Sequence, residues 1–436
     1  MTNESNYLKN LGISELNEMQ TEVLKEFQPK NDLVLYAPTG SGKTVAFLLS
    51  VLKTIDQSSD KIQVIIIAPV RELAIQIDTV IRKMSTGNRV ACVYGGHSIR
   101  EETRSLEVIP AIIIGTPGRI LDLIHRKIID VRNVHTLVLD EFDKSLELGF
   151  EGEMSEIAER LNKLETKILT SATEIENYPS FLQLNQPTTV NYLFLKDQIK
   201  TDFFVVRSKD TDKMEAAFLL ACQFKDETSI FFCNHRDAVD RLSIYFNHKE
   251  LVHAVFHGGL TQDDREKALI RFRNGTCPVF VSTDLAARGL DITDVGHVIH
   301  FQLPLDEKSF THRSGRTARA GKSGNVHFIL SEKEYLPEYL TIEPTEEIIN
   351  SKNSTPTLPK WETLFFDLGK KDKVNKIDLV GFLCQTGNLD KSEVGLITVL
   401  DHRSFVAVKK SKVKTVLASL NGQKIKKKQV RIRIAD

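Results

Sequence analysis

Short runs of branched and aromatic apolar residues recur along the chain, and stretches with helical spacing of apolar residues separate them. A run such as "QVIIIAP" has the length of a strand that is buried on both faces. Strands of this kind that alternate with helices are typical of a parallel sheet covered on both sides. In the first part of the chain the runs lie at 32–38, 63–69, 89–96, 111–117, 136–142 and 166–173. The pattern therefore predicts an α/β domain.

The pattern pauses near "LNQPTTVNYL" (184–193) and then starts again. The second set of runs lies at 203–208, 229–234, 252–259, 278–284, 297–303 and 325–330. Since this set is of similar size, we predict a second α/β domain of the same kind.

A third pattern follows the polar stretch at 350–360. It predicts strand 361–368, helix 378–386, strands 394–400 and 404–409, helix 411–420 and strand 428–434. This β-α-β-β-α-β order is the ferredoxin-like split unit. We therefore predict two tandem parallel-sheet α/β domains at 1–193 and 202–335, a linker at 336–358 and a small α+β domain at 359–436.

Charge is distributed unevenly along the chain, although the formal net charge is zero. Residues 361–436 contain sixteen Lys and Arg but only eight Asp and Glu, so the rest of the chain carries the opposite excess. A basic tail on an acidic body indicates a polyanionic partner, or else a tail that only aids solubility. Charge alone leaves both interpretations open.

The remaining composition excludes some classes of protein. It is 41% apolar and 27% charged, as in ordinary globular proteins. No run of eighteen apolar residues is present, so we expect no membrane span and a cytoplasmic location. The five cysteines form no CxxC pair, so neither a zinc site nor a disulfide framework is expected.

Residues 37–44, "APTGSGKT", follow the first predicted strand and precede a predicted helix. They match the phosphate-binding loop G-x-x-x-x-G-K-[ST], except that Ala37 replaces the first glycine. In such a loop, glycines let backbone N–H groups turn onto phosphate oxygens, and the helix N-terminus faces the same anion. We expect Lys43 to reach the β- and γ-phosphates and the Thr44 hydroxyl to ligate Mg²⁺.

Two adjacent acids, Asp140 and Glu141, end the strand of "TLVLDEFDKS". A buried strand rarely ends on two carboxylates unless something cationic lies there. A phosphate-binding loop needs an acid from a second strand to complete the magnesium shell, and Asp140 fits that role. Glu141 is placed to orient the attacking water. Asp143 lies beyond both acids and is expected to make an interdomain hydrogen bond.

Together with further motifs along the chain, these residues resemble those of the DEAD-box RNA helicases, and the resemblance covers nearly the whole chain. In the first half "APTGSGKT" resembles motif I, "APVRELA" (68–74) motif Ia, "GG" (95–96) the glycine doublet, "TPGR" (116–119) motif Ib, "DEFD" (140–143) motif II and "SAT" (171–173) motif III. In the second half "STDLAARGLDI" (282–292) resembles motif V and "HRSGRTARAG" (312–321) motif VI. The tail resembles the RRM-like RNA-binding domain of the DbpA type.

This resemblance implies RecA-like domains that use ATP and Mg²⁺. It implies that Arg316 and Arg319 are arginine fingers, that Asp291 contacts the ribose and that Gln20 binds adenine. The phosphate loop would supply Ala37, Pro38, Thr39, Gly40, Ser41, Gly42, Lys43 and Thr44. Coupling between ATP and RNA would involve Asp143, Ser171, Thr173 and His312, because only a closed arrangement completes the site.

The same resemblance implies RNA contacts that do not read sequence, because glycine N–H groups and hydroxyls bind phosphates. The residues expected to make them are Arg71, Gly95, Gly96, Thr116, Gly118, Arg119, Gly258, Gly259 and Thr283. In the family, the tail directs the enzyme to large-subunit ribosomal RNA, so we expect the protein to act on a pre-ribosomal particle. We also expect it to be a monomer. The strand at 403–410 has only Phe405 where an RRM presents several aromatics, so the basic residues are expected to bind more of the RNA.

Three positions depart from the family pattern: Phe142 stands in place of alanine, Ile13 in place of an aromatic and Val70 in place of threonine. We interpret Phe142 as a packing variant that does not abolish hydrolysis. Two alternatives to an RNA helicase stay open. One is a non-catalytic ATP-binding RNA clamp in which Phe142 is the lesion, and the other is a DNA translocase on the same sheets.

Overall fold

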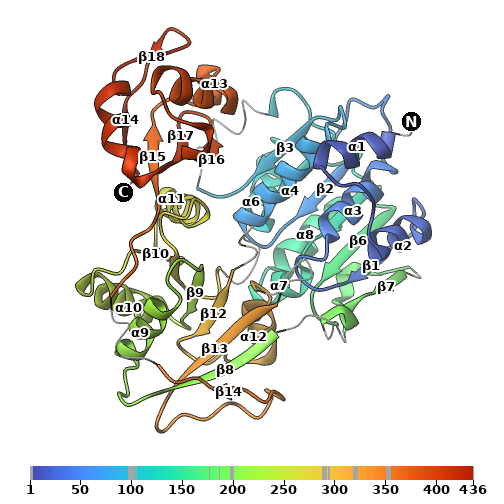
Figure 1. The fold of residues 1–436 in the computed structure, drawn as a ribbon. Coiled ribbons are helices and arrows are strands. Elements are labelled where there is room, and N and C mark those ends of the chain that lie inside the picture. Colours follow the sequence, from blue (N-terminus) through green and yellow to red (C-terminus); the bar gives the residue numbers. More distant parts are fainter. Residues whose placement is uncertain are drawn as a thin grey trace. The chain divides into compact units, whose positions relative to one another are not determined.

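The computed structural model describes residues 3–96, 103, 106–175, 177–185, 187–196, 201–286, 292, 295–317, 323–349 and 355–435. They form two parallel sheets and a small antiparallel C-terminal domain, as predicted (Figure 1). The chain divides into two compact units. One holds the first sheet, and the other holds the second sheet together with the C-terminal domain.

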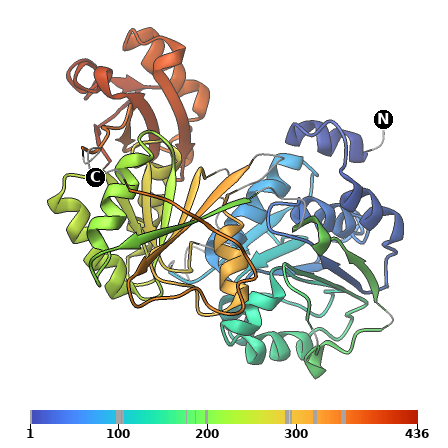
Figure 2. The ribbon, with the colours of Figure 1, turned by 60° about the horizontal axis from the view of Figure 1, so that its bottom comes forward.

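The first sheet has seven parallel strands in the order β3-β4-β2-β5-β6-β1-β7. The strands are β1 (Leu33–Tyr36), β2 (Val64–Ile67), β3 (Val90–Val93), β4 (Ile112–Gly115), β5 (Thr136–Leu139), β6 (Thr166–Ser171) and β7 (Thr188–Asn191). Helices cover both faces (Figure 2): α1 (Asn3–Leu11), α2 (Glu18–Glu26), α3 (Lys43–Leu52), α4 (Arg71–Met84), α6 (Pro117–His125), α7 (Phe142–Glu147) and α8 (Glu151–Arg160).

Alternation along β1 explains why this sheet needs helices on both sides. Leu33 and Leu35 belong to the core on one face, whereas Val34 and Tyr36 belong to the core on the other. Successive side chains of a strand point to opposite faces, so an all-apolar strand must be buried twice. The edge strand β7 was not predicted. Its sequence, "TTVN", has a single buried residue and therefore gives no apolar run.

The second sheet is also seven-stranded and parallel, in the order β10-β11-β9-β12-β13-β8-β14. The strands are β8 (Thr201–Ser208), β9 (Ser229–Phe232), β10 (His253–Phe256), β11 (Val279–Ser282), β12 (His297–His300), β13 (Gly324–Ser331) and β14 (Thr345–Glu346). Its helices are α9 (Met214–Gln223), α10 (Arg236–His248), α11 (Gln262–Arg273) and α12 (Glu307–Ser314). Strand β14 lies within the segment that the sequence analysis assigned to a linker.

The C-terminal domain has an antiparallel sheet in the order β16-β17-β15-β20. Its elements are β15 (Trp361–Phe366), α13 (Lys376–Gly381), β16 (Val394–Val399), β17 (Ser404–Lys409), α14 (Val413–Leu420) and β20 (Ile432–Ile434). This is the predicted β-α-β-β-α-β order. The predicted last strand at 428–434 was too long, because Lys428–Gln429 is β19 of a separate hairpin with β18 (Lys424–Ile425).

None of the helices in the described part of the chain is long and apolar enough to cross a membrane.

Candidate nucleotide site and nucleic-acid contacts

The loop between β1 and α3 has the backbone of a phosphate-binding loop. Gly40 and Gly42 have φ angles of 85° and 91°, which L side chains rarely adopt. Gly42 also lies against Gln20, because a Cβ at position 42 would come within 2.4 Å of the Gln20 Nε2 atom. Helix α3 begins at Lys43, directly after this turn. Glycine is therefore favoured at position 42 by its backbone conformation, and a larger residue there would also have to displace the end of the Gln20 side chain.

Lys43 is buried and directed into its own loop. Its Nζ donates to the carbonyl oxygen of Ala37 at 2.5 Å and to that of Pro38 at 3.4 Å. A buried ammonium needs such acceptors, because the loss of hydration is otherwise costly. These carbonyls keep the amine at the mouth of the loop. A phosphate oxygen that arrives there would offer a stronger, charge-assisted partner.

Gln20 is joined to the phosphate loop through a capping box. Its backbone N–H donates to Asn17 Oδ1 at 2.9 Å, and its side-chain Oε1 accepts from the Asn17 N–H at 3.1 Å. Gln20 Nε2 donates to the Gly42 carbonyl at 3.2 Å, and Asn17 Nδ2 donates to the Ser41 carbonyl at 2.9 Å. The sequence analysis did not name Asn17, although its Asn-x-x-Gln spacing is a capping-box signal.

Asp140 is buried at the carboxyl end of β5, on the same sheet edge as the phosphate loop. Thr170 Oγ1 donates to Asp140 Oδ1 at 2.5 Å and accepts from the Glu141 backbone N–H at 3.2 Å. Burial raises the pKa of Asp140, while the Thr170 hydrogen bond and the charge of Lys43 act in the opposite direction. Asp140 and Lys43 are therefore close enough to interact electrostatically.

Thr170 was missed because its role depends on the order of the strands. Strand β6 pairs with β5 in the register Leu139↔Leu169, so Thr170 lies opposite Asp140 one step further on. Nothing in the local sequence of Thr170 indicates this contact. The chain also turns sharply here, since Glu141 has φ 47° and precedes α7.

Asp143, Ser171 and Thr173 are brought together within the first unit. Thr173 Oγ1 donates to Asp143 Oδ2 at 2.8 Å, and the Thr173 N–H donates to Ser171 Oγ at 3.1 Å. The Ser171 hydroxyl donates in return to the Thr173 carbonyl oxygen. This bond of Asp143 lies within the first unit, and the interdomain hydrogen bond expected of Asp143 stays a prediction.

Phe142 is fully buried and belongs to the core of the first sheet. Its ring lies edge-on to that of Phe181, with 6.5 Å between centroids. An edge-to-face pair in a packed core is favourable. The ring therefore fills core volume, which agrees with its interpretation as a packing variant.

Predicted RNA-contact residues of the first unit gather beside α4. The Arg71 guanidinium lies 4.2 Å above the centre of the Tyr94 ring. Gly96 has φ 96°, and a Cβ there would lie 3.4 Å from Arg71 Nη1. Gly95 has open space around its Cα, so a backbone could approach closely. Tyr94 is a further member of this group that the sequence analysis did not name.

Three more predicted RNA contacts lie at the start of α6. Thr116 is its N-cap residue, and Arg119 Nη1 donates to Asp122 Oδ2 at 3.2 Å. A Cβ added to Gly118 would meet nothing within 4 Å, so the backbone is accessible at this turn. A helix N-terminus with an open backbone can bind a phosphate.

In the second unit, Arg313 is fully buried and makes three hydrogen bonds. It donates to Asp284 Oδ1 at 2.5 Å, to the Gln302 carbonyl at 2.9 Å and to Asn234 Oδ1 at 2.7 Å. It thereby connects motif VI to Asp284 of motif V. The sequence analysis named neither Arg313 nor Asp284 as a site residue.

The other predicted site residues of this unit are placed as follows. His312 and Arg316 are each 1% exposed, and both lie near Arg313 along the chain. The Gly259 N–H donates to His257 Nδ1 at 3.1 Å, next to Gly258. Thr283 directly follows β11. Asp291 and Arg319 lie outside the described residues.

Three parts of the sequence match known families. Residues 17–180 match the DEAD/DEAH box helicase family, residues 212–321 the helicase conserved C-terminal domain and residues 363–434 the DbpA RNA binding domain. The ATP-dependent RNA helicase DbpA of Escherichia coli is 30% identical over 98% of this chain and 96% of its own length. The chain belongs to the DbpA-type DEAD-box RNA helicases.

Other relatives agree with this assignment. DbpA of Bacillus subtilis is 29% identical over 98% of this chain and 96% of its own length. CshA of Listeria monocytogenes is 35% identical over 81% of this chain and 68% of its own. The match to CshA covers less of both chains than the matches to DbpA do. Together with the match of residues 363–434, this distinguishes the DbpA-type helicase from CshA by its C-terminal domain.

The fold is shared with solved helicase structures. S. cerevisiae Dbp5 bound to RNA and ADP BeF3 has a TM-score of 0.70 at 24% identity, over 80% of this chain and 93% of that one. Mss116p bound to single-stranded RNA and AMP-PNP has a TM-score of 0.69 at 24% identity, over 81% and 78%. The DbpA-type helicase hydrolyses ATP and binds RNA, and neither the non-catalytic clamp nor the DNA translocase is favoured.

Proposed function

We propose that this helicase unwinds short duplexes in large-subunit ribosomal RNA during assembly of the large ribosomal subunit, as a cytoplasmic monomer. The observation that carries the proposal is the C-terminal domain, which matches the DbpA RNA binding domain and holds sixteen Lys and Arg in residues 361–436. The helicase sheets contact RNA through backbone and hydroxyl groups, which do not read sequence. A separate basic domain would supply the preference for one RNA.

For the nucleotide, we propose that Gln20 binds adenine and that residues 37–44 bind the phosphates. Lys43 would exchange its loop carbonyls for β- and γ-phosphate oxygens. Glu141 would orient the attacking water, since it follows Asp140 on the same strand end. Asp291 would contact the ribose, Arg316 and Arg319 would act as arginine fingers, and His312 would take part in coupling ATP to RNA.

For the metal, the donors fit a hard cation. Asp140 and Thr44 offer oxygen atoms, which Mg²⁺ prefers. The described residues contain no cluster of three or more His, Cys, Asp or Glu side chains that could hold a metal by themselves. This agrees with an ion that takes few protein ligands and completes its shell with water and phosphate. When bound, Mg²⁺ would neutralise charge on the phosphates.

For the RNA, we propose that Arg71, Gly95, Gly96, Thr116, Gly118 and Arg119 of the first unit contact the backbone. Gly258, Gly259 and Thr283 would do so from the second. The open space at Gly95 and at Gly118 supports this proposal, since a phosphate could approach the backbone closely at both glycines.

The test is ATPase stimulation by a large-subunit ribosomal RNA fragment against a random RNA of equal length. The full chain should respond to the ribosomal fragment at lower concentration. A chain that ends at residue 357 should still hydrolyse ATP with either RNA, but without preference. A thermal unfolding curve of each protein is the control for folding. If the shortened chain keeps the preference, the C-terminal domain is not its source.

A further inference from the structure

This inference rests on the proposed function and concerns the turn that carries Gly258 and Gly259. The turn joins β10 to α11 at the carboxyl end of β10 (Figure 1). The Leu260 N–H closes it by donating to the His257 carbonyl oxygen at 3.1 Å. The His257 residue is only 5% exposed, whereas both glycines are exposed. A buried histidine therefore directly precedes two exposed glycines that are expected to meet RNA.

The two ring nitrogens of His257 have different partners. Nδ1 accepts a hydrogen bond from the Gly259 backbone N–H at 3.1 Å, so Nδ1 carries no proton in this arrangement. Nε2 then carries the proton of the neutral ring and donates to Asp240 Oδ1 of α10 at 3.0 Å. Asp240 thereby selects the tautomer that can accept from Gly259. The series Asp240–His257–Gly259 connects helix α10 to the turn.

The two glycines occupy different surroundings. A Cβ at Gly259 would lie 3.1 Å from His257 Nδ1 and 3.2 Å from its Cε1 atom, which is tighter than most Cβ contacts. A Cβ at Gly258 would meet nothing within 4 Å. Neither glycine has a positive φ angle that L side chains would avoid. Space beside the His257 ring therefore explains Gly259, but neither conformation nor packing explains Gly258.

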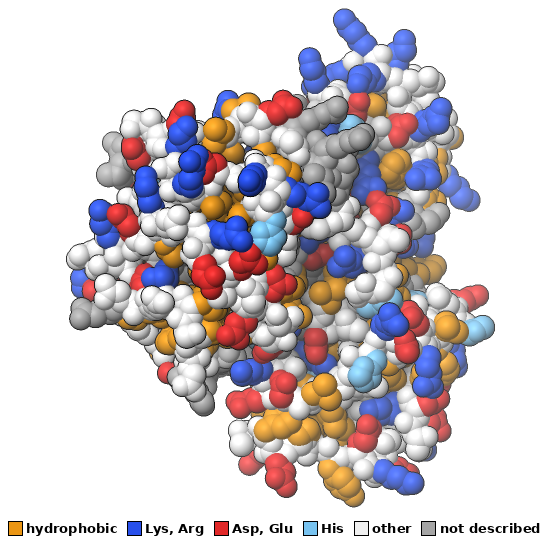
Figure 3. Space-filling model, turned by 180° about the vertical axis from the view of Figure 1, so that it is seen from behind, with side chains coloured by type: hydrophobic (Ala, Val, Ile, Leu, Met, Phe, Trp, Pro, Cys, Tyr) orange, Lys and Arg blue, Asp and Glu red, His pale blue; other side chains and the backbone are white. Residues whose placement is uncertain are grey.

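A close approach by a ligand backbone would explain Gly258. Gly258 is exposed, and none of the described residues accepts a hydrogen bond from its N–H. Such an N–H can donate to a phosphate oxygen without reading sequence. On the face of the molecule in Figure 3, acidic and basic side chains are interspersed. A contact made by a backbone N–H does not depend on a continuous basic surface.

We propose that His257 is a positioning residue for RNA binding, and that Gly258 is the glycine whose N–H contacts the RNA backbone. The Gly259 N–H belongs to the peptide group between the two glycines. By holding that peptide group, His257 restrains Gly258, which as a glycine has the greatest backbone freedom. Without this bond RNA would have to order the turn on binding, and the cost of ordering lowers affinity. His257 thus acts through Gly259 and does not touch the RNA.

The test removes one contact of His257 at a time in the full chain. In His257→Asn, the new Oδ1 takes the place of Nδ1 and can accept from the Gly259 N–H, as asparagine does in an Asx turn. In His257→Gln, the longer amide reaches toward Asp240 and leaves Gly259 without its acceptor. The two variants are matched in charge and polarity but keep opposite contacts.

The first readout is the concentration of a random single-stranded RNA that gives half-maximal ATP hydrolysis, and the second is the rate at saturating RNA. His257→Asn should stay within about twofold of the wild type in both. His257→Gln should need about tenfold more RNA, with its saturated rate within about twofold, because the turn contributes to binding and not to ATP chemistry. Equal behaviour of the two variants, rescue by Gln but not by Asn, or a lower saturated rate at an unchanged RNA requirement would each overturn the proposal.

A second pair of variants tests the contact at Gly258. Gly258→Ala places a methyl group where RNA approaches and should raise the RNA requirement by about tenfold or more. Gly152→Ala, on exposed α8 surface, is the matched control, since a Cβ there also meets nothing within 4 Å. Neither change should lower the midpoint of thermal unfolding. Wild-type RNA affinity in Gly258→Ala would show that no RNA comes close to this turn.

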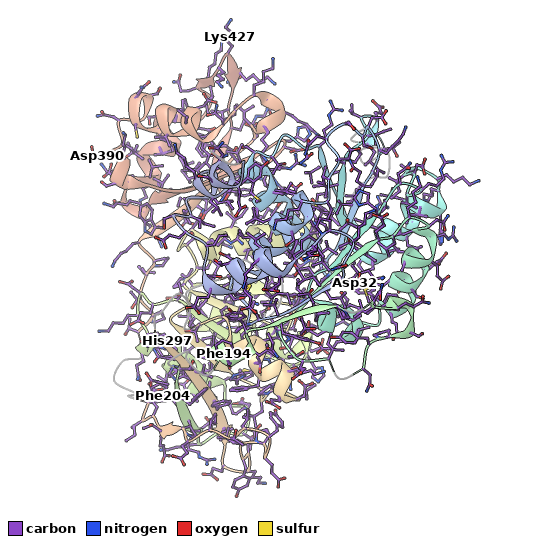
Figure 4. The ribbon with its side chains drawn as sticks, turned by 90° about the vertical axis from the view of Figure 1, so that its right-hand side faces the viewer. Asp32, Phe194, Phe204, His297, Asp390 and Lys427 are labelled. Atoms are coloured by element: carbon purple, nitrogen blue, oxygen red, sulfur yellow. The ribbon has the colours of Figure 1, made fainter. Side chains whose placement is uncertain are left out.

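A third comparison separates positioning from general stability. His297→Asn removes another buried histidine of the second sheet, at the amino end of β12 (Figure 4). Because its ring bonds with His327 and Glu227, its loss should lower the midpoint of thermal unfolding. The RNA requirement should not change. If His297→Asn and His257→Gln both raise the RNA requirement in proportion to their loss of stability, His257 has only a structural role.

Repeating the measurements with a large-subunit ribosomal RNA fragment separates this inference from the proposed function. A backbone contact reads no sequence, so His257→Gln should lose affinity for both RNAs by the same factor. If the wild type does not prefer the ribosomal fragment, the ribosomal role fails. A difference between His257→Asn and His257→Gln would still support the positioning role of His257.

Discussion

The two parallel sheets have the same architecture but different chemistry at their strand ends. Both have the first strand next to last, and both place the remaining six strands in corresponding positions. The sequences of matching strands differ, since "LVLY" of β1 corresponds to "TDFFVVRS" of β8. Apolar strands that alternate with helices are sufficient for this order, whatever the side chains are.

The loops after β1 and β8 show the difference most clearly. After β1, glycines at positive φ bring backbone N–H groups together, and Lys43 opens the helix. After β8 there is no glycine before α9, and Lys213 itself has φ 61°. Lys213 Nζ lies 2.9 Å from Glu334 Oε2 in a cavity of about 350 Å³ that Phe301 and Gln302 also line. The charge of Lys213 is neutralised by Glu334, whereas Lys43 donates to the carbonyl oxygens of Ala37 and Pro38.

The ends of β5 and β12 differ in the same way. β5 is followed by Asp140 and Glu141, whereas β12 is followed by Phe301 and Gln302. Gln302 supports Arg313 with its carbonyl and accepts from the Asn234 N–H at 2.8 Å. The two sheets therefore place their strand ends in corresponding positions, whereas the residues that follow those strands give the two ends different chemistry.

The largest effect should come from Arg319→Ala. If the second sheet supplies charge rather than a phosphate loop, turnover should fall by about 10³–10⁵ because an arginine finger acts on the transition state. ATP affinity should be nearly unchanged, since residues 37–44 are intact. ATPase rates and nucleotide titration measure the two quantities. Lys308→Ala, on exposed α12 surface, is the control, and equal losses in affinity and rate would contradict the role of Arg319.

Glu141→Gln should be next. Loss of the group that orients water should lower turnover by about 10²–10⁴ while ATP still binds. Single-turnover phosphate release with saturating RNA measures this, and Glu151→Gln on exposed α8 is the matched control. Wild type and Glu141→Gln releasing phosphate equally slowly would instead indicate that the first sheet does not catalyse.

Phe142→Ala should affect folding rather than chemistry. Removing a fully buried ring should lower the free energy of unfolding by about 3–5 kcal/mol, because a cavity is left beside Phe181. Urea unfolding followed through the first sheet measures this. Phe142→Leu keeps most of the volume and should lose less. A folded Phe142→Ala protein with strongly raised ATPase activity would show that the ring restrains catalysis.

Lys213→Met should have the smallest effect and is the sharpest test of the comparison. It breaks the pair with Glu334 and should cost about 1 kcal/mol of stability, since that pair is partly exposed. ATP affinity should not change. The matching substitution, Lys43→Met, should abolish tight ATP binding. Loss of ATP binding in Lys213→Met would show that the second sheet has a phosphate site after all.

The features that the sequence predicted correctly are those carried by neighbouring residues. The apolar runs specify buried strands, the glycines specify a turn at positive φ just before Lys43, and Asp140 with Glu141 specify an acidic strand end. Each depends on backbone geometry and side chains within about ten residues. The capping box of Asn17 and Gln20 was of this local kind too and could have been found.

Edge strands needed the tertiary structure. β7 and β14 are short and largely exposed, so their sequences carry no strand pattern. They are strands only because β1 and β8 offer unpaired backbone groups beside them. The β18–β19 hairpin was merged with the last strand for a related reason, because its lysine turn lacks the Asn-Gly signal.

Contacts between distant segments were decided by the fold alone. Thr170 reaches Asp140 because β6 pairs with β5, and the lysines at 370–373 and 424–428 meet because Lys428 pairs with Asp372. Phe405 looked like an open stacking residue in the sequence, yet Ile270 of α11 covers it. A sequence pattern can tell that a side chain will be buried or charged. Which surface buries it, or which charge meets it, depends on the packing of elements far apart in the chain.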